Sequence, residues 1–313
     1  MLTARLLFVR CCRLDRCSLH RRCRIPILCL LLMAMFALPG ALAAQVKQTN
    51  KIINFRLRDR YLIVVQTTVN GVGPFSFLLD TGATHTVIDP NLARQLGASV
   101  IGEASLTTVS DVRRDRLVRL KQVRVGDSEV SELGAIIDKL DDVKLKAPGI
   151  RGVLGEDFLS NFDFLIDYKE RTLRFGEDAP AGERCRFETM GHYRGLPTTN
   201  RLLIEAEFMD VSGGKVQLQL DTGARMPELF PVRDDSFPSQ PWAGSMAFTS
   251  GPNGTRIHSP TTIKVGSTTV HDLDVIQSRR GVAFDAVGLL PASIFHRIYI
   301  SHSGGFVVLN PGE

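Results

Sequence analysis

From residue 50 onwards, the chain consists of short apolar runs separated by clusters of Gly, Asn, Asp and Pro. No long stretch repeats its apolar residues with the 3.6-residue period of an amphipathic helix. Short runs rich in Val, Ile, Leu, Phe and Thr and bounded by turn residues are typical of β-strands. The pattern therefore predicts an all-β protein built from sandwich-like or barrel-like sheets, with a few short helices.

One arrangement of runs occurs twice. The run Tyr61–Val69 is followed by turn residues 70–74 and a second run that ends at Leu79. In the second half, the run Arg201–Met209 is followed by turn residues 210–214 and a run that ends at Leu220. Each pair of runs predicts a hairpin.

The repeat continues downstream, where Gly152–Leu159 aligns with Gly288–Phe295. Each segment predicts a buried glycine turn followed by one or two turns of helix. A final hairpin is expected after each, at 164–175 and 298–309. The chain thus contains two copies of a unit of roughly 115 residues, joined by a Gly- and Pro-containing connector at 177–199.

One further helix is predicted within Asp89–Gly97. Asp89 is a candidate N-cap, Pro90 occupies the first helical position, and Gly97 follows the last helical residue.

The first 43 residues have the pattern of an export signal. A basic stretch through Arg24 precedes the 14-residue apolar run Ile25–Leu38, and Pro39-Gly40 and then Ala41-Leu42-Ala43 follow, an A-x-A cleavage pattern. Because the run is shorter than the ~20 residues that span a bilayer, we predict a cleaved signal peptide over residues 1–43. The protein would then be exported, to a periplasm or outside the cell. The alternative is an uncleaved segment that anchors it.

Charge and cysteine content add little to this interpretation. The net charge of +5 comes from the arginines before residue 44, and residues 44–313 carry 31 basic and 32 acidic side chains. This balance gives no electrostatic reason to expect nucleic acid, and no stable membrane association is expected after signal cleavage. Cys185 is the single cysteine outside residues 1–43, so residues 44–313 cannot form an internal disulfide.

The strongest chemical signal is the tetrapeptide Asp-Thr-Gly-Ala, which ends each repeated hairpin, at Asp80–Ala83 and at Asp221–Ala224. Burial at the end of an apolar strand disfavours the charged form of a carboxylate, so such a residue needs partners or a shared proton. Two such turns in a duplicated chain predict two carboxylates that meet. The alternative is that each is a buried turn aspartate satisfied by backbone donors.

The run Phe77–Ile88 resembles the active-site strand and turn of retropepsin-like and pepsin-like aspartic peptidases, and Gly152–Gly155 is similar to the glycine element that crosses behind that turn. The resemblance is strong over most of 55–176 and weaker over 200–313. It implies a two-lobed acid-protease fold, a pseudo-twofold pair of β-barrel-like lobes.

Together with the repeat, the resemblance predicts an N-terminal lobe at 44–190 and a C-terminal lobe at 191–313. It also implies an endopeptidase in which Asp80 and Asp221 share one proton. The ionised member would act as general base on a bound water, and the protonated member would hydrogen-bond the scissile carbonyl. This chemistry needs no metal and no cofactor, and the histidines show no spacing typical of metal ligands.

The resemblance assigns supporting roles to the rest of both turns. In the family, the threonines matching Thr81 and Thr222 exchange hydrogen bonds across the lobe interface. The glycines matching Gly82 and Gly223 allow a tight turn and leave backbone N–H groups free to hold the carboxylates.

The residue after each glycine is alanine, at Ala83 and Ala224. A serine hydroxyl there could donate to the carboxylates and favour their ionised form. Without it, the pair should hold its proton to higher pH, which predicts activity extending to weakly acidic or near-neutral conditions.

The second half departs from the family pattern. Thr86 follows the first turn as the pattern expects, whereas Arg225-Met226-Pro227 follows the second, and Pro291 replaces a glycine of the glycine element. The hairpin that would close over substrate is expected near Ser105–Val123, with a counterpart near Phe248–Thr261. The first hairpin carries four arginines and no tyrosine, which allows either a solvated hairpin or contacts to an acidic substrate; they are Arg113, Arg114, Arg116 and Arg119.

We expect a monomeric aspartic endopeptidase that acts on a peptide or protein. The alternative is a catalytically inactive peptide-binding or inhibitor-like protein on the same fold. A third arrangement, in which each lobe pairs with its copy in a second chain, is unnecessary because one chain holds both motifs. Carboxyl oxygens more than about 6 Å apart would argue against the catalytic hypothesis, because direct proton sharing would then fail.

Overall fold

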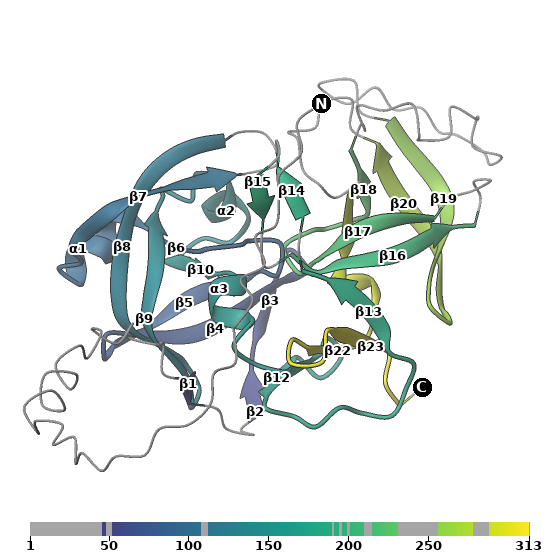
Figure 1. Cartoon of the computed structure of the whole chain (residues 1–313), viewed down its shortest axis with the longest axis horizontal. Coiled ribbons are helices and arrows are strands. Elements are labelled where there is room, and N and C mark those ends of the chain that lie inside the picture. Colours follow the sequence, from purple (N-terminus) through teal and green to yellow (C-terminus); the bar gives the residue numbers. More distant parts are fainter. Residues whose placement is uncertain are drawn as a thin grey trace, which may run out of the picture. The chain divides into compact units, whose positions relative to one another are not determined.

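The structure is a computed structural model that describes residues 46–47, 52–107, 112–189, 191–193, 196–198, 201–209, 215–230, 256–277 and 288–312. The predicted signal peptide at 1–43 lies outside these residues. Strands dominate the described part of the chain, and its helices are short (Figure 1). The all-β prediction is confirmed.

The first barrel is a closed ring of six strands. Neighbours around the ring pair in the order β4 (Leu62–Val69), β5 (Val72–Leu79), β10 (Gly152–Leu154), β6 (Thr86–Ile88), β9 (Ser128–Ile137) and β8 (Val112–Val125), and β8 pairs with β4. Three strands attach to it, namely β1 (Val46–Lys47) on β9, β3 (Arg56–Arg58) on β4 and β7 (Val100–Thr107) on β8.

The second barrel repeats this order. Its ring is β16 (Leu203–Phe208), β17 (Lys215–Asp221), β21 (Gly288–Pro291), β18 (Glu228–Leu229), β20 (Thr268–Gln277) and β19 (Arg256–Val265), which pairs with β16. Each ring strand of the first barrel has a counterpart at the same place in the second. The internal repeat predicted from the sequence is therefore a repeat of structure.

A six-stranded sheet joins the two barrels. Its order is β2 (Ile52–Asn54), β12 (Thr172–Phe175), β11 (Phe164–Asp167), β22 (Arg297–Ser301), β23 (Phe306–Leu309) and β13 (Cys185–Glu188). At its centre, β11 from the first copy pairs antiparallel with β22 from the second, with Leu165 opposite Tyr299. The hairpins β11–β12 and β22–β23 have matching registers, which make Phe164 the counterpart of Ile298 and Tyr168 the counterpart of His302. A separate hairpin consists of β14 (Gly191–Tyr193) and β15 (Leu196–Thr198).

The helices are local. Helix α1 (Pro90–Gln95) begins after Asp89, whose side chain accepts a hydrogen bond from Leu92 N–H, so the helix predicted within Asp89–Gly97 is confirmed. Helix α3 (Glu156–Leu159) and the 3₁₀ helix η2 (Ala292–Ile294) follow the two glycine elements as expected, and α2 (Asp141–Lys146) was not predicted. Among the described residues, no helix is long and apolar enough to cross a membrane.

The first hairpin turn is tighter than the sequence predicted. Turn residues were expected over 70–74, but β5 already begins at Val72, and the turn consists of Asn70 and Gly71 alone. Both have positive φ, 50° and 76°, the combination that an Asn-Gly turn between twisted antiparallel strands requires. Asn70 Oδ1 also accepts a hydrogen bond from Gln122 N–H (3.1 Å), which attaches the turn to β8.

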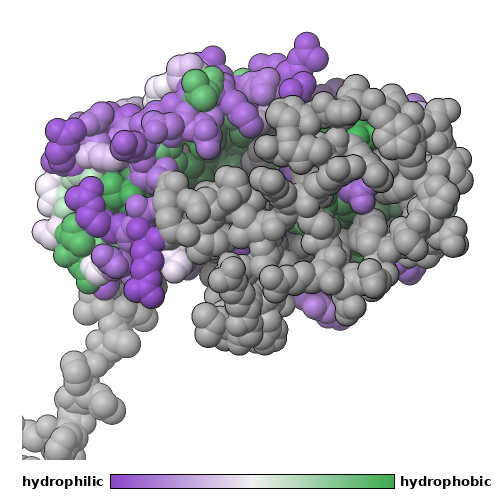
Figure 2. Space-filling view, turned by 90° about the horizontal axis from the view of Figure 1, so that it is seen from above, coloured by the Kyte–Doolittle hydropathy of each residue, from purple (hydrophilic) through white to green (hydrophobic). Residues whose placement is uncertain are grey.

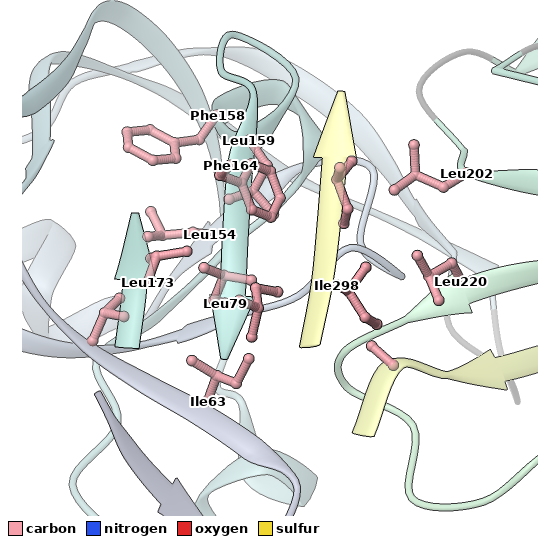
Figure 3. Packing of buried hydrophobic residues seen from close by; sticks show 14 of the residues in the cluster. Ile63, Leu79, Leu154, Phe158, Leu159, Phe164, Leu173, Leu202, Leu220 and Ile298 are labelled. Atoms are coloured by element: carbon pink, nitrogen blue, oxygen red, sulfur yellow. The ribbon is translucent and has the colours of Figure 1, made fainter. Parts of the chain in front are cut away.

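The main hydrophobic core extends across both copies. Leu79, Leu154 and Phe158 from the first copy and Leu220 and Ile298 from the second are buried in one cluster (Figure 3). On the face shown in Figure 2, hydrophilic side chains form most of the described outer surface. Burying each large apolar side chain contributes about 1.5–3 kcal/mol, and this shared core holds the two repeated hairpins against each other.

Asp89 connects three elements of the first lobe. Besides capping α1, its carboxylate accepts a hydrogen bond from Arg151 Nε (3.0 Å) and lies 3.3 Å from Lys144 Nζ of α2. Burial opposes ionisation of Asp89, but the hydrogen bonds from Leu92 and Arg151 and both positive charges outweigh it, so the pKa of Asp89 is lowered.

We predict that Asp89→Ala lowers the free energy of unfolding by about 3 kcal/mol at pH 7, because it removes the cap of α1 and leaves Arg151 and Lys144 without their carboxylate partner. A group with a lowered folded pKa stabilises above its unfolded pKa and loses that effect as pH falls through the folded pKa. The difference from wild type should therefore shrink below about pH 3.9. Urea unfolding at several pH values tests this, with Asp141→Ala, at an exposed acid of α2, as the control; equal losses for both variants would contradict the prediction.

Candidate active site

The two Asp-Thr-Gly-Ala turns meet between the barrels. Strand β5 ends just before Asp80, and its counterpart β17 ends at Asp221. The two carboxyl groups are hydrogen-bonded to each other. The structure therefore brings together the two aspartates that the sequence paired, close enough to share a proton directly.

Each carboxylate is held by N–H groups of its own turn. Gly82 N–H donates to Asp80 Oδ1 (2.8 Å), and Gly223 N–H donates to Asp221 Oδ1 (2.6 Å). Asp221 Oδ1 also accepts from Ala224 N–H (3.1 Å), and Ala83 N–H donates to Asp80. Such donors fix the orientation of a carboxylate and favour its ionised form.

The turn glycines are required by contact between the lobes. A Cβ on Gly82 would lie 2.5 Å from the carboxyl group of Asp221, and one on Gly223 would lie 2.9 Å from the carboxyl oxygens of Asp80. Each glycine thus makes room for the aspartate of the opposite lobe. The sequence predicted glycine here for the tight turn and the free N–H groups, and the structure adds this second reason.

The threonines exchange hydrogen bonds across the interface, as the family resemblance implied. Thr81 N–H donates to Thr222 Oγ1 (3.0 Å), and Thr222 N–H donates to Thr81 Oγ1 (3.1 Å). Each hydroxyl donates in turn to a carbonyl of the other lobe, Thr81 to Leu220 O (2.9 Å) and Thr222 to Leu79 O (2.8 Å). Both side chains are fully buried, so these four bonds fix the separation of the two turns.

Burial and mutual repulsion decide where the proton resides. Burial raises the pKa of both aspartates, and the negative charge of Asp80 raises that of Asp221 further. Asp80 receives a hydrogen bond from Asp221, which favours the ionised form of Asp80. The pair therefore shares one proton, and the negative charge of Asp80 favours keeping that proton on Asp221. As a coupled pair, the two groups titrate together.

The first turn has a support that the second lacks. Thr86 donates from both its N–H and its hydroxyl to Asp157 (2.8 and 2.7 Å), and Gly155 N–H donates to Thr86 Oγ1 (3.3 Å). The corresponding position in the second lobe, six residues after the aspartate, is Pro227, which has no N–H and no hydroxyl. The second turn cannot form the same anchor.

A different polar contact supports the second turn. Gln219 of β17 donates from Nε2 to Gly82 O in the first lobe (3.0 Å), and Arg201 donates from Nη1 to Gln219 Oε1 (3.0 Å). Gln219 and Arg201 are 2% and 5% exposed. The sequence missed them because Gln217 and Gln219 alternate with Val216 and Leu218, the pattern of a strand with one polar face in solvent.

A hairpin is present where the covering hairpin of the first lobe was predicted, since β7 pairs with β8. Arg114, Arg116 and Arg119 of β8 are exposed, and Arg119 forms an ion pair with Glu132 (3.6 Å). Residues 108–111 at the tip lie outside the described residues, as do 248–255 of the expected counterpart. Within the described part of the chain, no cluster of His, Cys, Asp or Glu has the arrangement of a metal site.

Comparison with known proteins agrees with this geometry. Residues 65–158, which include the first turn and the glycine element behind it, match the family model described as aspartyl protease. This match supports an aspartic peptidase family for the segment that it covers.

Solved structures of aspartic peptidases resemble this chain over different spans. An aspartic proteinase from Irpex lacteus is 12% identical, with a TM-score of 0.54, and the match covers 83% of this chain and 97% of that one. A retropepsin-like aspartic protease from Rickettsia conorii is 20% identical, with a TM-score of 0.32, over 42% of this chain and 93% of that one. No curated protein sequence matches. The Irpex lacteus match extends the acid-protease fold to both lobes of this chain.

We predict that Thr81→Val lowers the free energy of unfolding by about 2–4 kcal/mol, because Thr222 N–H and Leu220 O would be buried without partners. Thr222→Val should cost a similar amount, since it removes the same bonds from the other lobe. Urea unfolding measures both losses. Thr84→Val, at a partly exposed position, is the control, and a loss for Thr81→Val no larger than for this control would contradict the prediction.

Proposed function

We propose that this protein is an exported aspartic endopeptidase in which Asp80 and Asp221 activate a water molecule to hydrolyse peptide bonds. The observation that carries the proposal is the hydrogen-bonded pair of carboxyl groups delivered by equivalent turns of two equivalent lobes. The match of residues 65–158 to the aspartyl protease family model and the acid-protease fold support it.

The protonation of the pair suggests how the reaction would proceed. Asp80, as the ionised member, takes a proton from the water as it attacks the scissile carbonyl. Asp221 donates its hydrogen bond to the carbonyl oxygen and stabilises the negative charge that develops there. The proton on Asp80 then reaches the leaving nitrogen as the C–N bond breaks, and the pair returns to its singly protonated state. The residues of both turns suffice for each of these proton transfers.

The competing proposal is a catalytically inactive, peptide-binding protein on the same fold. The divergence of the second lobe around Pro227 and Pro291 is its motivation. Two observations favour catalysis instead. Asp221 keeps its N–H donors from Gly223 and Ala224, and Gln219 supplies a cross-lobe bond in place of the missing anchor.

Export, the oligomeric state and the lobe boundaries stay predictions from the sequence. The basic and apolar leader with its A-x-A pattern supports export. Because both aspartates belong to one chain, a monomer has a complete site. The proposed substrate is a peptide or protein, since the chemistry acts on an amide and the family comprises peptidases.

We predict that Asp80→Asn and Asp221→Asn each reduce kcat by at least about 10³-fold, because neither variant can hold a shared proton between two carboxylates. Cleavage of a peptide library by the purified protein, followed by mass spectrometry, measures the effect. Both substitutions keep the size of the side chain, and circular dichroism checks that the variants fold. Equal cleavage by wild type and both variants would refute the assignment.

The pH dependence provides a second test. Because the pKa of both aspartates is raised, the singly protonated pair should persist above the ordinary carboxylate range of about pH 4, and kcat/KM should remain high into weakly acidic conditions. Ala224→Ser adds a hydroxyl that can donate to Asp221, which favours ionisation and should move the alkaline limb to lower pH. A wild-type profile confined below about pH 4 would contradict this prediction.

A further inference from the structure

A buried polar contact crosses between the lobes directly behind the first active-site turn. Glu156 is the first residue of α3, and His302 follows β22 of the second lobe. His302 Nε2 lies 2.8 Å from Glu156 Oε2, and the two side chains are 7% and 0% exposed. Neither residue stands out in the sequence, because 146 positions separate them.

Glu156 is attached to the active-site turn through its backbone. Its N–H donates to Ala83 O (2.8 Å), in the residue that follows the Asp-Thr-Gly sequence of the first lobe. The preceding Gly155 packs so closely against this turn that a Cβ there would lie 2.6 Å from His85 O. A movement of α3 would therefore move the turn that holds Asp80.

Hydrogen-bond geometry determines how many protons the contact holds. His302 Nδ1 lies 2.9 Å from Phe162 O, and a carbonyl can only accept, so Nδ1 carries a hydrogen. In a neutral imidazole, Nε2 would then present a lone pair to Glu156 Oε2. A 2.8 Å contact between these two acceptors needs a proton, held either by an imidazolium or by a carboxylic acid.

The pseudo-twofold relation shows that this pair is specific to the Asp80 side. The counterpart of Glu156 is Ala292, by the register of the glycine elements, and the counterpart of His302 is Tyr168, by the register of the hairpins β11–β12 and β22–β23. The hydroxyl of Tyr168 is buried and has no hydrogen-bond partner among the described residues. Behind Asp221 the same space thus holds a methyl group and a phenol, with no ionic contact between them.

We propose that Glu156 and His302 form a proton-sharing latch between the lobes that positions the first active-site turn, so that both are positioning residues for Asp80. This inference rests on the proposed peptidase function for its consequence in catalysis. The latch itself rests on the contact geometry alone.

The charged groups around Glu156 and His302 affect the pH at which their contact loses its proton. Asp157 and Asp80 face Glu156, Asp163 faces His302, and His85 is 3.9 Å from Asp157. Phe164 and Phe187 pack against the imidazole, with ring centroids 5.7 and 6.0 Å away. Burial raises the pKa of Glu156. For His302, burial opposes protonation, but the hydrogen bond and charge of Glu156 outweigh it and raise the pKa.

A histidine with a raised folded pKa stabilises below its unfolded pKa, and the stabilisation is lost as pH rises through the folded value. The latch should therefore lose its proton, and with it its attraction, on the alkaline side of the folded pKa of His302. At pH values below the folded pKa of His302, the shared proton keeps His302 hydrogen-bonded to Glu156.

The test compares wild type with His302→Gln and Glu156→Gln in the full chain, by urea unfolding from about pH 6 to pH 9 and by peptide hydrolysis over the same range. The wild-type unfolding midpoint should fall as pH rises, and this fall should be smaller in both variants, in which the carboxyl pair of Asp80 and Asp221 still loses its proton but the latch does not. Their kcat should decrease by about 10-fold or more, with KM changed less than about twofold, because the turn is displaced while the cleft is retained.

Two further variants separate positioning from general stability. Tyr168→Phe removes the hydroxyl at the pseudo-equivalent position and should leave kcat within about twofold of wild type and its pH dependence unchanged. The double variant Glu156→Ala with His302→Tyr copies the arrangement behind Asp221. It should fold even if a single variant does not, because it leaves no buried charge at this contact, and its unfolding midpoint should fall less with rising pH than that of wild type.

The outcomes are distinct for the two proposals. Absence of peptide cleavage by wild type would overturn the proposed function but leave the unfolding test of the latch intact. A double variant that keeps the wild-type pH dependence of unfolding would overturn the latch. Equal losses of kcat in Tyr168→Phe and His302→Gln would overturn the positioning role, since the effect would then be general to the joining sheet.

Discussion

The structure depends on holding two carboxyl groups in contact within a protein interior. Two negative charges at such close range repel strongly, and burial strengthens the repulsion, so the contact survives only with a proton between them. Proton sharing in turn requires the separation of the two turns to be fixed. The reciprocal bonds of Thr81 and Thr222 supply that restraint, and the glycines at 82 and 223 remove the atoms that would prevent the approach. Closed barrels and a shared core then keep each turn attached to a rigid body.

The two turns reach the same geometry by different means. Behind Asp80 the turn is anchored within its own lobe by Thr86 and Asp157. The second lobe has proline at the position of Thr86, and Gln219 reaches instead across the interface to Gly82 O. Loss of a local anchor is thus offset by a bond between lobes. Divergence of sequence around Asp221 is not by itself evidence of a degraded site.

Much of this arrangement follows from local sequence. Hydrophobic periodicity and turn residues predicted the strands, the repeat predicted two equivalent lobes, and the duplicated Asp-Thr-Gly-Ala predicted the facing aspartates. The Asn70-Gly71 turn was placed too broadly because Val72, Gly73 and Pro74 were read as turn residues, although the strand already begins at Val72. The capped helix at Asp89 was predictable because all its signals lie within a few residues.

What escaped prediction are the contacts made by residues far apart in the chain. Gln219 alternates with apolar neighbours as an exposed strand residue would, and its burial results from the approach of the other lobe. Glu156 and His302 come into contact only because β11 pairs with β22, and no local sequence pattern reveals that pairing. Single-sequence reasoning identified the groups that carry charge in the site but not the groups that support them from behind.

The joining sheet has a consequence for the order in which the site is assembled. Strands β22 and β23 are synthesised after every other strand that builds the two turns, yet β22 pairs with β11 at the centre of the sheet. Contacts between segments so distant in sequence form slowly, because the intervening chain must first be ordered. The first lobe can therefore complete its barrel while Asp80 still has no partner. A nascent chain would therefore lack the facing pair of aspartates until nearly all of it has been made.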